Sequence, residues 1–114
     1  MNVSATNKAY LAGYFDGEGA VMVKVTQRKT MESVTVNVAA SQKYGTGLEL
    51  FKQYYKGNVY GPFKGDVYMW KANGWEAYKF LQEVLPWLTV KKPKAIAAIQ
   101  AWDSHLHRSS QNSP

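Results

Sequence analysis

Two acidic residues separated by a glycine, Asp16 and Glu18, stand in the segment Asp-Gly-Glu-Gly, and their type and spacing could bind a metal ion. Mg²⁺ takes oxygen ligands and needs few carboxylates, because water molecules and phosphate oxygens complete its coordination shell. On its own, however, such a tetrapeptide is more often a turn. The chemistry therefore depends on the elements that position these two carboxylates.

The absence of cysteine excludes disulfides, thiolate metal sites and cysteine nucleophiles, and it fits a reducing compartment. The N-terminal segment lacks a basic region followed by an apolar stretch. We therefore expect an intracellular protein, of the cytoplasm, nucleoid or an organelle matrix, that is not secreted. The apolar runs are too short for a transmembrane helix, so no membrane partner is expected.

Positive charge is the strongest compositional feature. The chain has a net charge of +6, and its lysines and arginines concentrate in residues 20–30, 43–65 and 84–94. A basic domain favours polyanionic partners such as nucleic acid or acidic lipid. Excess charge alone is weak evidence for such a partner. Its clustering in predicted strands, loops and a helix start is stronger evidence for a polyanion-binding surface.

Hydrophobic periodicity divides the chain into helices and strand pairs. A helix capped by Thr6 or Asn7 is predicted to run to about Asp16. Strict alternation then predicts strands over residues 20–28 and 34–41, with valines on one face and polar, partly basic side chains on the other. The remaining predicted elements are helices over residues 46–55 and 75–85 and from Pro93, and a second hairpin over residues 58–63 and 66–72.

This order, α-β-β-α-β-β-α-α, predicts an α+β fold whose antiparallel sheet is covered by helices on one face. The chain of 114 residues, 46% of them hydrophobic, suits one domain with a real core. We assign that domain to residues 1–107. The Ser-, Asn- and Gln-rich residues 108–114 are expected to form a disordered tail.

Small residues recur every four positions along the first predicted helix, at Ala5, Ala9, Gly13 and Gly17. Small side chains at this spacing let two helix backbones approach closely. Each glycine costs roughly 1 kcal/mol in a helix interior. A close contact that offsets this cost is therefore expected on this face.

Residues 11–19, LAGYFDGEG, resemble the LAGLIDADG motif of homing endonucleases, in which the fourth and fifth positions vary among apolar residues and the eighth is Asp or Glu. The match lies at the end of a predicted helix that enters a strand. Residues 85–95, LPWLTVKKPKA, resemble the family segment L-P-[FYW]-L-x-[LIV]-K-x-K/P-x-A that leads into the last helix. The element order is similar to the family's αββαββα core, so the resemblance extends from about residue 8 to residue 105.

The resemblance implies a site-specific double-strand DNA endonuclease, a phosphodiester hydrolase that depends on a divalent metal. Its cofactor would be Mg²⁺, and Mn²⁺ or Ca²⁺ could substitute for binding. The resemblance further implies that Glu18 binds the metal, that Lys91 is the active-site lysine and that Gln42 belongs to the solvent network of the site. The role of Asp16 stays open between assisting the metal and making a hydrogen bond at the helix end.

The resemblance also implies a homodimer, in which the motif helices of two copies pack against each other at Ala9, Gly13 and Gly17. Two copies of Glu18 would then lie near the dimer axis and build a two-carboxylate site from one residue. Because a two-fold dimer has identical halves, it would cut both strands of a long pseudo-palindromic target.

The partly basic strand face is expected to lie in the major groove of double-stranded DNA, and no small-molecule substrate is expected. Side chains suited to base edges are Lys24, Thr26, Arg28, Thr35 and Asn37. Side chains suited to phosphates are Lys29, Lys43, Lys64, Lys92 and Lys94, and Lys71 could belong to either group.

Two other classes of function are possible from the sequence. The first is a catalytically inactive nucleic-acid-binding protein such as an intron maturase. Such a protein need not keep Glu18 or Lys91, so the presence of both favours the nuclease. The second is a basic protein-interaction domain, against which the charge clustered on one strand face argues.

Overall fold

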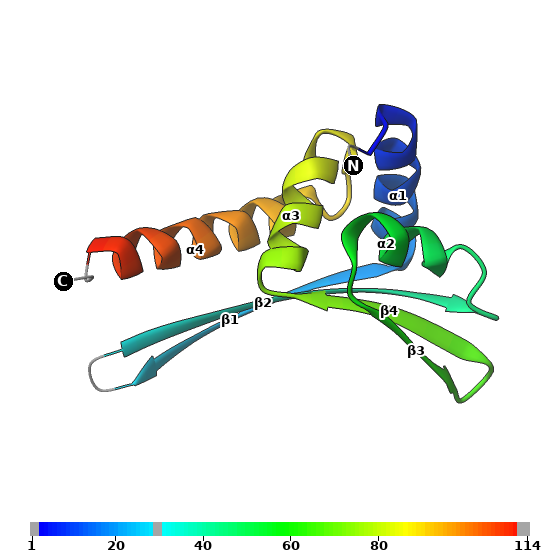
Figure 1. Cartoon of the computed structure of the whole chain (residues 1–114), viewed down its shortest axis with the longest axis horizontal. Coiled ribbons are helices and arrows are strands. Elements are labelled where there is room, and N and C mark those ends of the chain that lie inside the picture. The colour runs from blue at the N-terminus through cyan, green and yellow to red at the C-terminus, as the bar shows by residue number, and fades with distance from the viewer. Residues whose placement is uncertain (1–2, 29–30, 112–114) are drawn as a thin grey trace.

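The computed structural model describes residues 3–28 and 31–111, and of residues 28, 31 and 107–111 the backbone alone. In chain order its elements are α1 (Ala5–Glu18), β1 (Gly19–Arg28), β2 (Met31–Lys43), α2 (Leu48–Tyr55), β3 (Asn58–Phe63), β4 (Val67–Asn73), α3 (Trp75–Val84), the 3-10 turn η1 (Leu85–Trp87) and α4 (Lys92–Gln111) (Figure 1). This order confirms the predicted α+β arrangement, with α4 as the second of the two closing helices.

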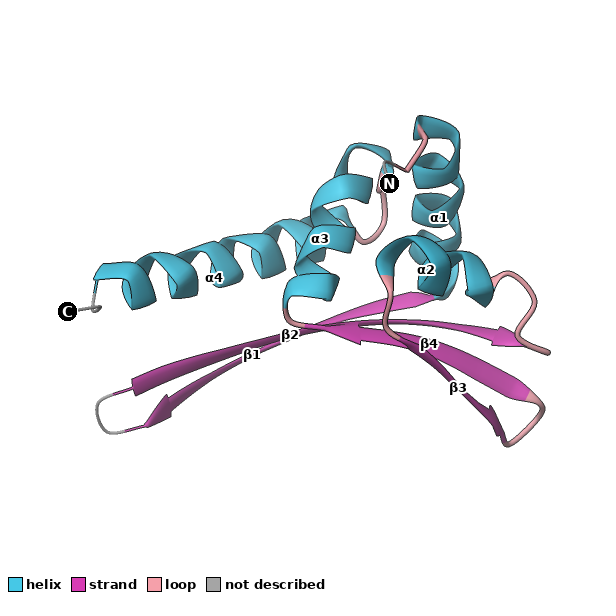
Figure 2. Cartoon of the chain, in the orientation of Figure 1, coloured by secondary structure: helices cyan, strands magenta, loops and turns pink. Residues whose placement is uncertain are grey.

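The four strands form one antiparallel sheet in the order β1-β2-β4-β3. β2 is its central long strand, since it pairs with β1 from Met31 to Ala40 and with β4 from Asn37 to Lys43. These pairings also explain why β2 is longer at both ends than the alternating run at residues 34–41. Figure 2 shows all the helices on one side of the sheet, as predicted.

The predicted alternation places the strand faces correctly. Val21, Val36 and Val38 are almost completely buried and belong to the core under the helices. The register pairs Met22 with Asn37 and Lys24 with Thr35 across β1 and β2 on the other side. We call that side, which no helix covers, the open face.

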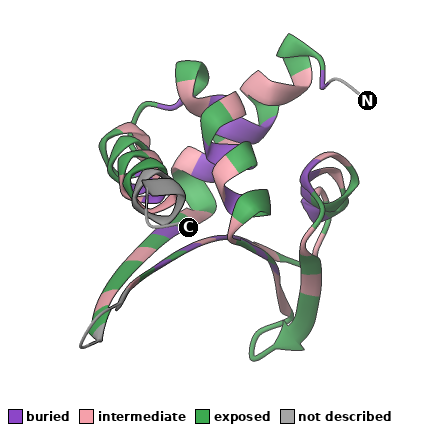
Figure 3. Ribbon diagram, turned by 60° about the vertical axis from the view of Figure 1, so that its left-hand side comes forward, coloured by how far each residue is buried: buried purple, intermediate pink, exposed green. Residues whose placement is uncertain are grey.

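The sheet bends into an arch whose concave side is the open face (Figure 3). The two hairpins form its sides, and the helices pack over the top. The cover does not extend along the whole of β1, since Val25 points to the helix side and is nevertheless 51% exposed. The core therefore ends at about the Val25–Val34 pair of the β1–β2 hairpin, where Val34 is still buried.

Aromatic rings join the helices to the middle of the sheet. Phe51 of α2 stacks on Trp70 of β4 with ring centroids 4.7 Å apart, and Phe80 of α3 meets Trp70 edge-on at 5.2 Å. Phe15 of α1 packs on Phe80 at 5.0 Å. The buried Trp70 ring also donates a 2.6 Å hydrogen bond from Nε1 to the Lys56 carbonyl, which satisfies its one polar atom. One cluster thus holds α1, α2 and α3 on the sheet.

The start of the first helix and the end of the last helix also differ from the sequence predictions. Ser4, rather than Thr6 or Asn7, caps α1, because its hydroxyl accepts a 3.2 Å hydrogen bond from the Asn7 N–H. α4 continues to Gln111, where a disordered tail was expected from residue 108. No glycine or proline lies between 108 and 111, and serine and glutamine are tolerated in a helix. Among the described helices, none is long and apolar enough to cross a bilayer.

The aromatic cluster generates a stability prediction. Phe80 is fully buried against four other rings, so Phe80→Ala should lower the free energy of unfolding by about 3–5 kcal/mol. The control is Val90→Ala, since Val90 is 70% exposed, and its effect should stay within about 0.5 kcal/mol. Urea denaturation followed by circular dichroism measures both, and equal losses would contradict the assignment of the core.

Candidate functional site

The end of α1 is fixed by a glycine. Gly19 packs so tightly on Phe15 that a Cβ atom there would overlap both the Phe15 ring and its carbonyl oxygen. The Gly19 N–H donates to that same carbonyl and closes the last helical turn. The chain therefore passes directly from helix to strand after Glu18, and the Glu18 side chain is exposed at this junction.

Asp16 ties a distant segment to the end of α1. One of its carboxylate oxygens accepts a 2.8 Å hydrogen bond from the Thr89 N–H, and the other accepts a 2.9 Å hydrogen bond from the Lys91 N–H. Both oxygens thus hold the loop that precedes α4. Of the two roles that the sequence left open for Asp16, the structure shows the hydrogen-bonding one.

This loop delivers Lys91 to the same helix end. The Lys91 ammonium donates a 3.0 Å hydrogen bond to the Asp16 carbonyl oxygen, in the last turn of α1. The last turn carries no basic residue of its own, and a cation at a helix C-terminus is favoured by the helix dipole. The Lys91 ammonium is therefore held at Asp16, two residues before Glu18, although Lys91 and Glu18 are 73 positions apart in the sequence.

Tyr14 connects this helix end to β2. Its hydroxyl donates a 3.1 Å hydrogen bond to the Ser41 carbonyl. Burial raises the Tyr14 pKa to about 12, with smaller contributions from the charges of Glu18 and Tyr10. The hydroxyl thus remains a protonated donor at neutral pH, and the end of β2 stays attached to α1.

Gln42 follows Ser41 but points to the helix side of the sheet, opposite Tyr68. Its Oε1 atom is buried, has no hydrogen-bond partner among the described residues, and would lie 3.2 Å from a Cβ atom at Gly47. No described hydrogen bond joins it to Glu18 or Lys91. The structure therefore brings Glu18 and Lys91 to one helix end and places Gln42 beside α1 and the start of α2.

The small-residue face of α1 has no partner within the described chain. Ala5, Gly13 and Gly17 are exposed and Ala9 is partly exposed. A Cβ atom added at Gly13 or Gly17 would meet no atom within 4 Å. No contact inside the described chain therefore explains two glycines in a helix, where each costs roughly 1 kcal/mol.

The donors at this helix end suit part of a divalent-metal site. Within the described residues, no three carboxylates, histidines or cysteines are grouped closely enough to hold a metal. Asp16 is engaged by two N–H groups, so Glu18 is the carboxylate left for a metal at this end. One carboxylate suits Mg²⁺ when water, phosphate or a second carboxylate supplies the other ligands.

The predicted DNA contacts fall on three parts of the surface. Lys24, Thr26, Thr35, Asn37, Lys43 and Lys71 lie on the open face, by strand register. Lys64 is exposed in the turn between β3 and β4, and Lys92 and Lys94 lie in the first turn of α4, beside Lys91. Arg28 ends β1, but its side chain lies outside the described part, as does all of Lys29.

Asn73, which the sequence analysis did not single out, shares the open face with these residues. It is the last residue of β4 and pairs directly with Asn37 of β2. The strand predicted over residues 66–72 ends one residue before Asn73, and continuing it by one residue would have placed Asn73 on the same face as Lys71, two positions earlier.

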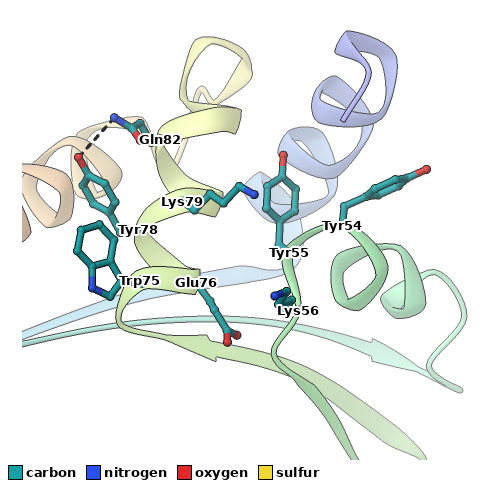
Figure 4. A pocket seen from close by; sticks show the side chains of 8 residues that line it. All are labelled: Tyr54, Tyr55, Lys56, Trp75, Glu76, Tyr78, Lys79 and Gln82. Atoms are coloured by element: carbon teal, nitrogen blue, oxygen red, sulfur yellow. Dashed lines mark hydrogen bonds between the residues drawn. The ribbon is translucent and has the colours of Figure 1, made fainter. Parts of the chain in front are cut away.

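A separate cavity of about 390 Å³ lies between α2 and α3, on the helix side of the sheet (Figure 4). The side chains that line it include Tyr54, Tyr55, Lys56, Trp75, Tyr78 and Lys79. Its polar groups are largely engaged within the chain. The Glu76 carboxylate accepts from the Gly57 N–H at 2.8 Å, and the Tyr55 hydroxyl, whose pKa is raised by burial and by Glu83, donates to Glu83 at 3.0 Å. None of the predicted site residues lines it.

The Asp16 contacts predict a defined effect of Asp16→Asn. An amide has only one acceptor oxygen, so one of the two N–H groups at Thr89 and Lys91 would lose its partner, at about 1–3 kcal/mol. Hydrogen exchange at these two amides should accelerate more than at the core strands. Glu49→Gln on the exposed surface of α2 is the control, and unchanged protection of residues 89–91 in Asp16→Asn would contradict the anchoring role.

No protein-family model and no curated protein sequence matches this chain. Among solved structures, homing endonuclease I-CvuI in complex with its target aligns at a TM-score of 0.73, with 20% identity over 91% of this chain and 70% of that chain. The archaeal intron-encoded homing endonuclease I-Vdi141I, complexed with DNA, aligns at 0.70, with 15% identity over 90% of this chain and 70% of that chain. The LAGLIDADG homing endonuclease I-GzeII, in complex with a DNA target, aligns at 0.71, with 17% identity over 93% of this chain and 38% of that chain. The chain therefore has the LAGLIDADG homing-endonuclease fold.

Proposed function

We propose that this protein is a site-specific endonuclease that cuts double-stranded DNA as a homodimer with a divalent metal. The observation that carries the proposal is the end of α1. Glu18 is exposed there, Asp16 and its loop hold Lys91 beside it, and the adjoining glycine face is open. Among solved proteins of this fold, I-CvuI and I-Vdi141I were both determined bound to DNA.

The open face supports duplex DNA as the substrate. Of its side chains that the structure describes, three are lysines, Lys24, Lys43 and Lys71, and none is acidic. A concave, basic, two-hairpin surface suits the major groove, which admits a two-stranded ribbon and is flanked by phosphates. Lys64 on the β3–β4 turn adds a cation suited to the backbone at one rim.

The exposed glycines support pairing of two copies. If the α1 helices of two copies cross at Gly13 and Gly17, the backbones can approach closely, and the contact offsets the cost of two helical glycines. Glu18 is one residue beyond Gly17, so two Glu18 side chains come near the two-fold axis. The homodimer then supplies the second carboxylate that a single chain lacks.

The residues at this junction suit phosphodiester hydrolysis. Glu18 would hold the metal, with Mg²⁺ as the proposed ion and Mn²⁺ or Ca²⁺ as substitutes for binding. Such an ion, when bound, lowers the pKa of water and offsets charge on the phosphate oxygens. Lys91 contributes a fixed positive charge that stabilises the negative charge developing on the scissile phosphate. Gln42 lies away from this junction, on the helix side of the sheet, and its proposed part is to orient water there through its buried Oε1, which has no described partner.

The nuclease assignment predicts that Glu18→Gln abolishes cleavage of a target plasmid in Mg²⁺ while leaving DNA affinity within a few-fold. The amide keeps the shape of the side chain but loses the charge that binds the metal. Glu49→Gln, an exposed substitution on α2, serves as the matched control and should cut normally. Gel analysis of nicked and linear plasmid measures cleavage. Undiminished cutting by Glu18→Gln would refute the metal role, and tight binding without cutting by the unaltered protein would favour the inactive-binder alternative.

The pairing assignment predicts opposite effects of Gly13→Leu on folding and on assembly. A side chain at Gly13 meets no atom in the single chain, so the substitution should stabilise α1 by up to about 1 kcal/mol. The same side chain should block the helix crossing and shift the sedimentation mass from a dimer to the 12.8 kDa monomer.

Ala97→Leu, on the exposed side of α4, is the control for adding a leucine to a helix surface. It should leave the mass unchanged. A monomeric unaltered protein that binds and cuts its target would overturn the shared-site proposal.

A further inference from the structure

The middle of the open face contains a shallow depression of about 260 Å³. Ala39 lies within it on β2 and contributes only a methyl group. The polar side chains that line it are Asn37, Lys71, Asn73 and Tyr60. The short side chain of Ala39 lies between the longer side chains of Asn37 on its own strand and Lys71 on β4. A planar group such as a base edge that enters the arch above Ala39 can therefore reach these polar atoms.

The two asparagines form a directly opposed cross-strand pair, Asn37 with Asn73. Directly opposed residues have Cβ atoms about 4.5–5.5 Å apart, so the two amides act at one place on the sheet. Neither side-chain amide makes a hydrogen bond within the described part of the chain, and both side chains are at least partly exposed. Each therefore keeps its donor and its acceptor for a ligand.

The rim of the depression is basic. The Lys71 ammonium lies 5.7 Å from the centroid of the Tyr60 ring, which restrains its direction. Lys71 is two residues before Asn73 on the same face of β4, about 7 Å along the strand. The site thus offers an amide pair and, beside it, a pure donor.

We propose that Asn73, together with Asn37, is a specificity-determining contact that selects an A·T base pair in each half of the target. The inference rests on the proposed function, since it takes the open face to lie in the major groove. An asparagine amide matches adenine with two hydrogen bonds, one accepted from N6–H and one donated to N7. The second amide of the pair can donate to thymine O4, so the opposed pair engages both bases.

Lys71 gives the recognition a direction along the target. A lysine donates only, and guanine offers two acceptors, N7 and O6, in the major groove. Lys71 therefore selects guanine at a position within about two base pairs of the A·T pair, given the strand spacing and the rise of the duplex. This depression is therefore assigned to hydrogen bonds with the edges of two nearby purines, adenine and guanine, rather than to a phosphate contact.

The test is selection of bound duplexes from a randomised library by the full-length protein in chelator, so that binding is measured without cleavage. The unaltered protein should enrich one A·T position in each half-site. Asn73→Asp has nearly the same shape but only accepts hydrogen bonds, so it should move that preference to cytosine, which donates from N4. The loss of discrimination for adenine should be roughly 10-fold or more.

Lys43→Ala is the matched control on the same face. It should lower affinity for every duplex and leave the base preferences unchanged, because Lys43 is assigned to phosphates. Asn37→Ala should weaken the base preference at the same target position where Asn73→Asp alters it. Thermal denaturation checks that each variant is folded. Lys71→Met should reduce only the preference for guanine at the neighbouring target position.

Failure of the Asn73 base contact and failure of the DNA-binding function give different outcomes in this selection. An unchanged adenine preference in Asn73→Asp, with target binding retained, would overturn the Asn73 assignment and leave the proposed nuclease intact. If the unaltered protein enriches duplexes without any A·T preference, the Asn73 assignment is likewise overturned and the proposed nuclease is left intact. If no duplex is enriched at all, both the base contact and the DNA-binding function are overturned.

Discussion

Two backbone hydrogen bonds to one carboxylate hold the candidate site together. Asp16 accepts from the N–H groups of Thr89 and Lys91, and so attaches the loop before α4 to the end of the first helix. The chain between Asp16 and Thr89 passes through both hairpins and three helical segments, so these hydrogen bonds join parts that are far apart in sequence. Together with the hydrogen bond from the Lys91 ammonium to the Asp16 carbonyl, this contact holds Lys91 close to Glu18.

The rest of the fold distributes two tasks between its layers. The aromatic cluster around Trp70 fastens α1, α2 and α3 to the middle of the sheet, so that the end of α1 is rigid where it enters β1. The opposite side of the same strands carries the lysines and amides. Since successive residues of a strand point to opposite faces, the core that fixes Glu18 also fixes the surface proposed to contact DNA.

Local patterns in the sequence predicted much of this arrangement. The valine alternation gave both faces of β1 and β2, and the glycine spacing identified the uncovered face of α1, because both features depend on neighbours within a few residues. The role of Asp16 could not be predicted in that way, since its partners are more than seventy residues away. The direct pairing of Asn73 with Asn37 depends on the strand register, which the sequence does not give. For Gln42 the alternation alone was sufficient. Gln42 is an even number of residues from Val34, Val36 and Val38, so it lies with them on the helix side of the sheet.

The uncovered end of the β1–β2 hairpin has a consequence for how the sheet meets a partner. Beyond the Val25–Val34 pair the ribbon extends past the packed core, since Val34 is buried while Val25 is 51% exposed, so its local stability comes mainly from cross-strand pairing. Such a segment opens at a lower free energy than the strands under the helices. The hairpin is thus the compliant part of an otherwise rigid arch. A partner that seats along the whole arch would have to order this end, and part of its binding free energy would be spent on that conformational entropy.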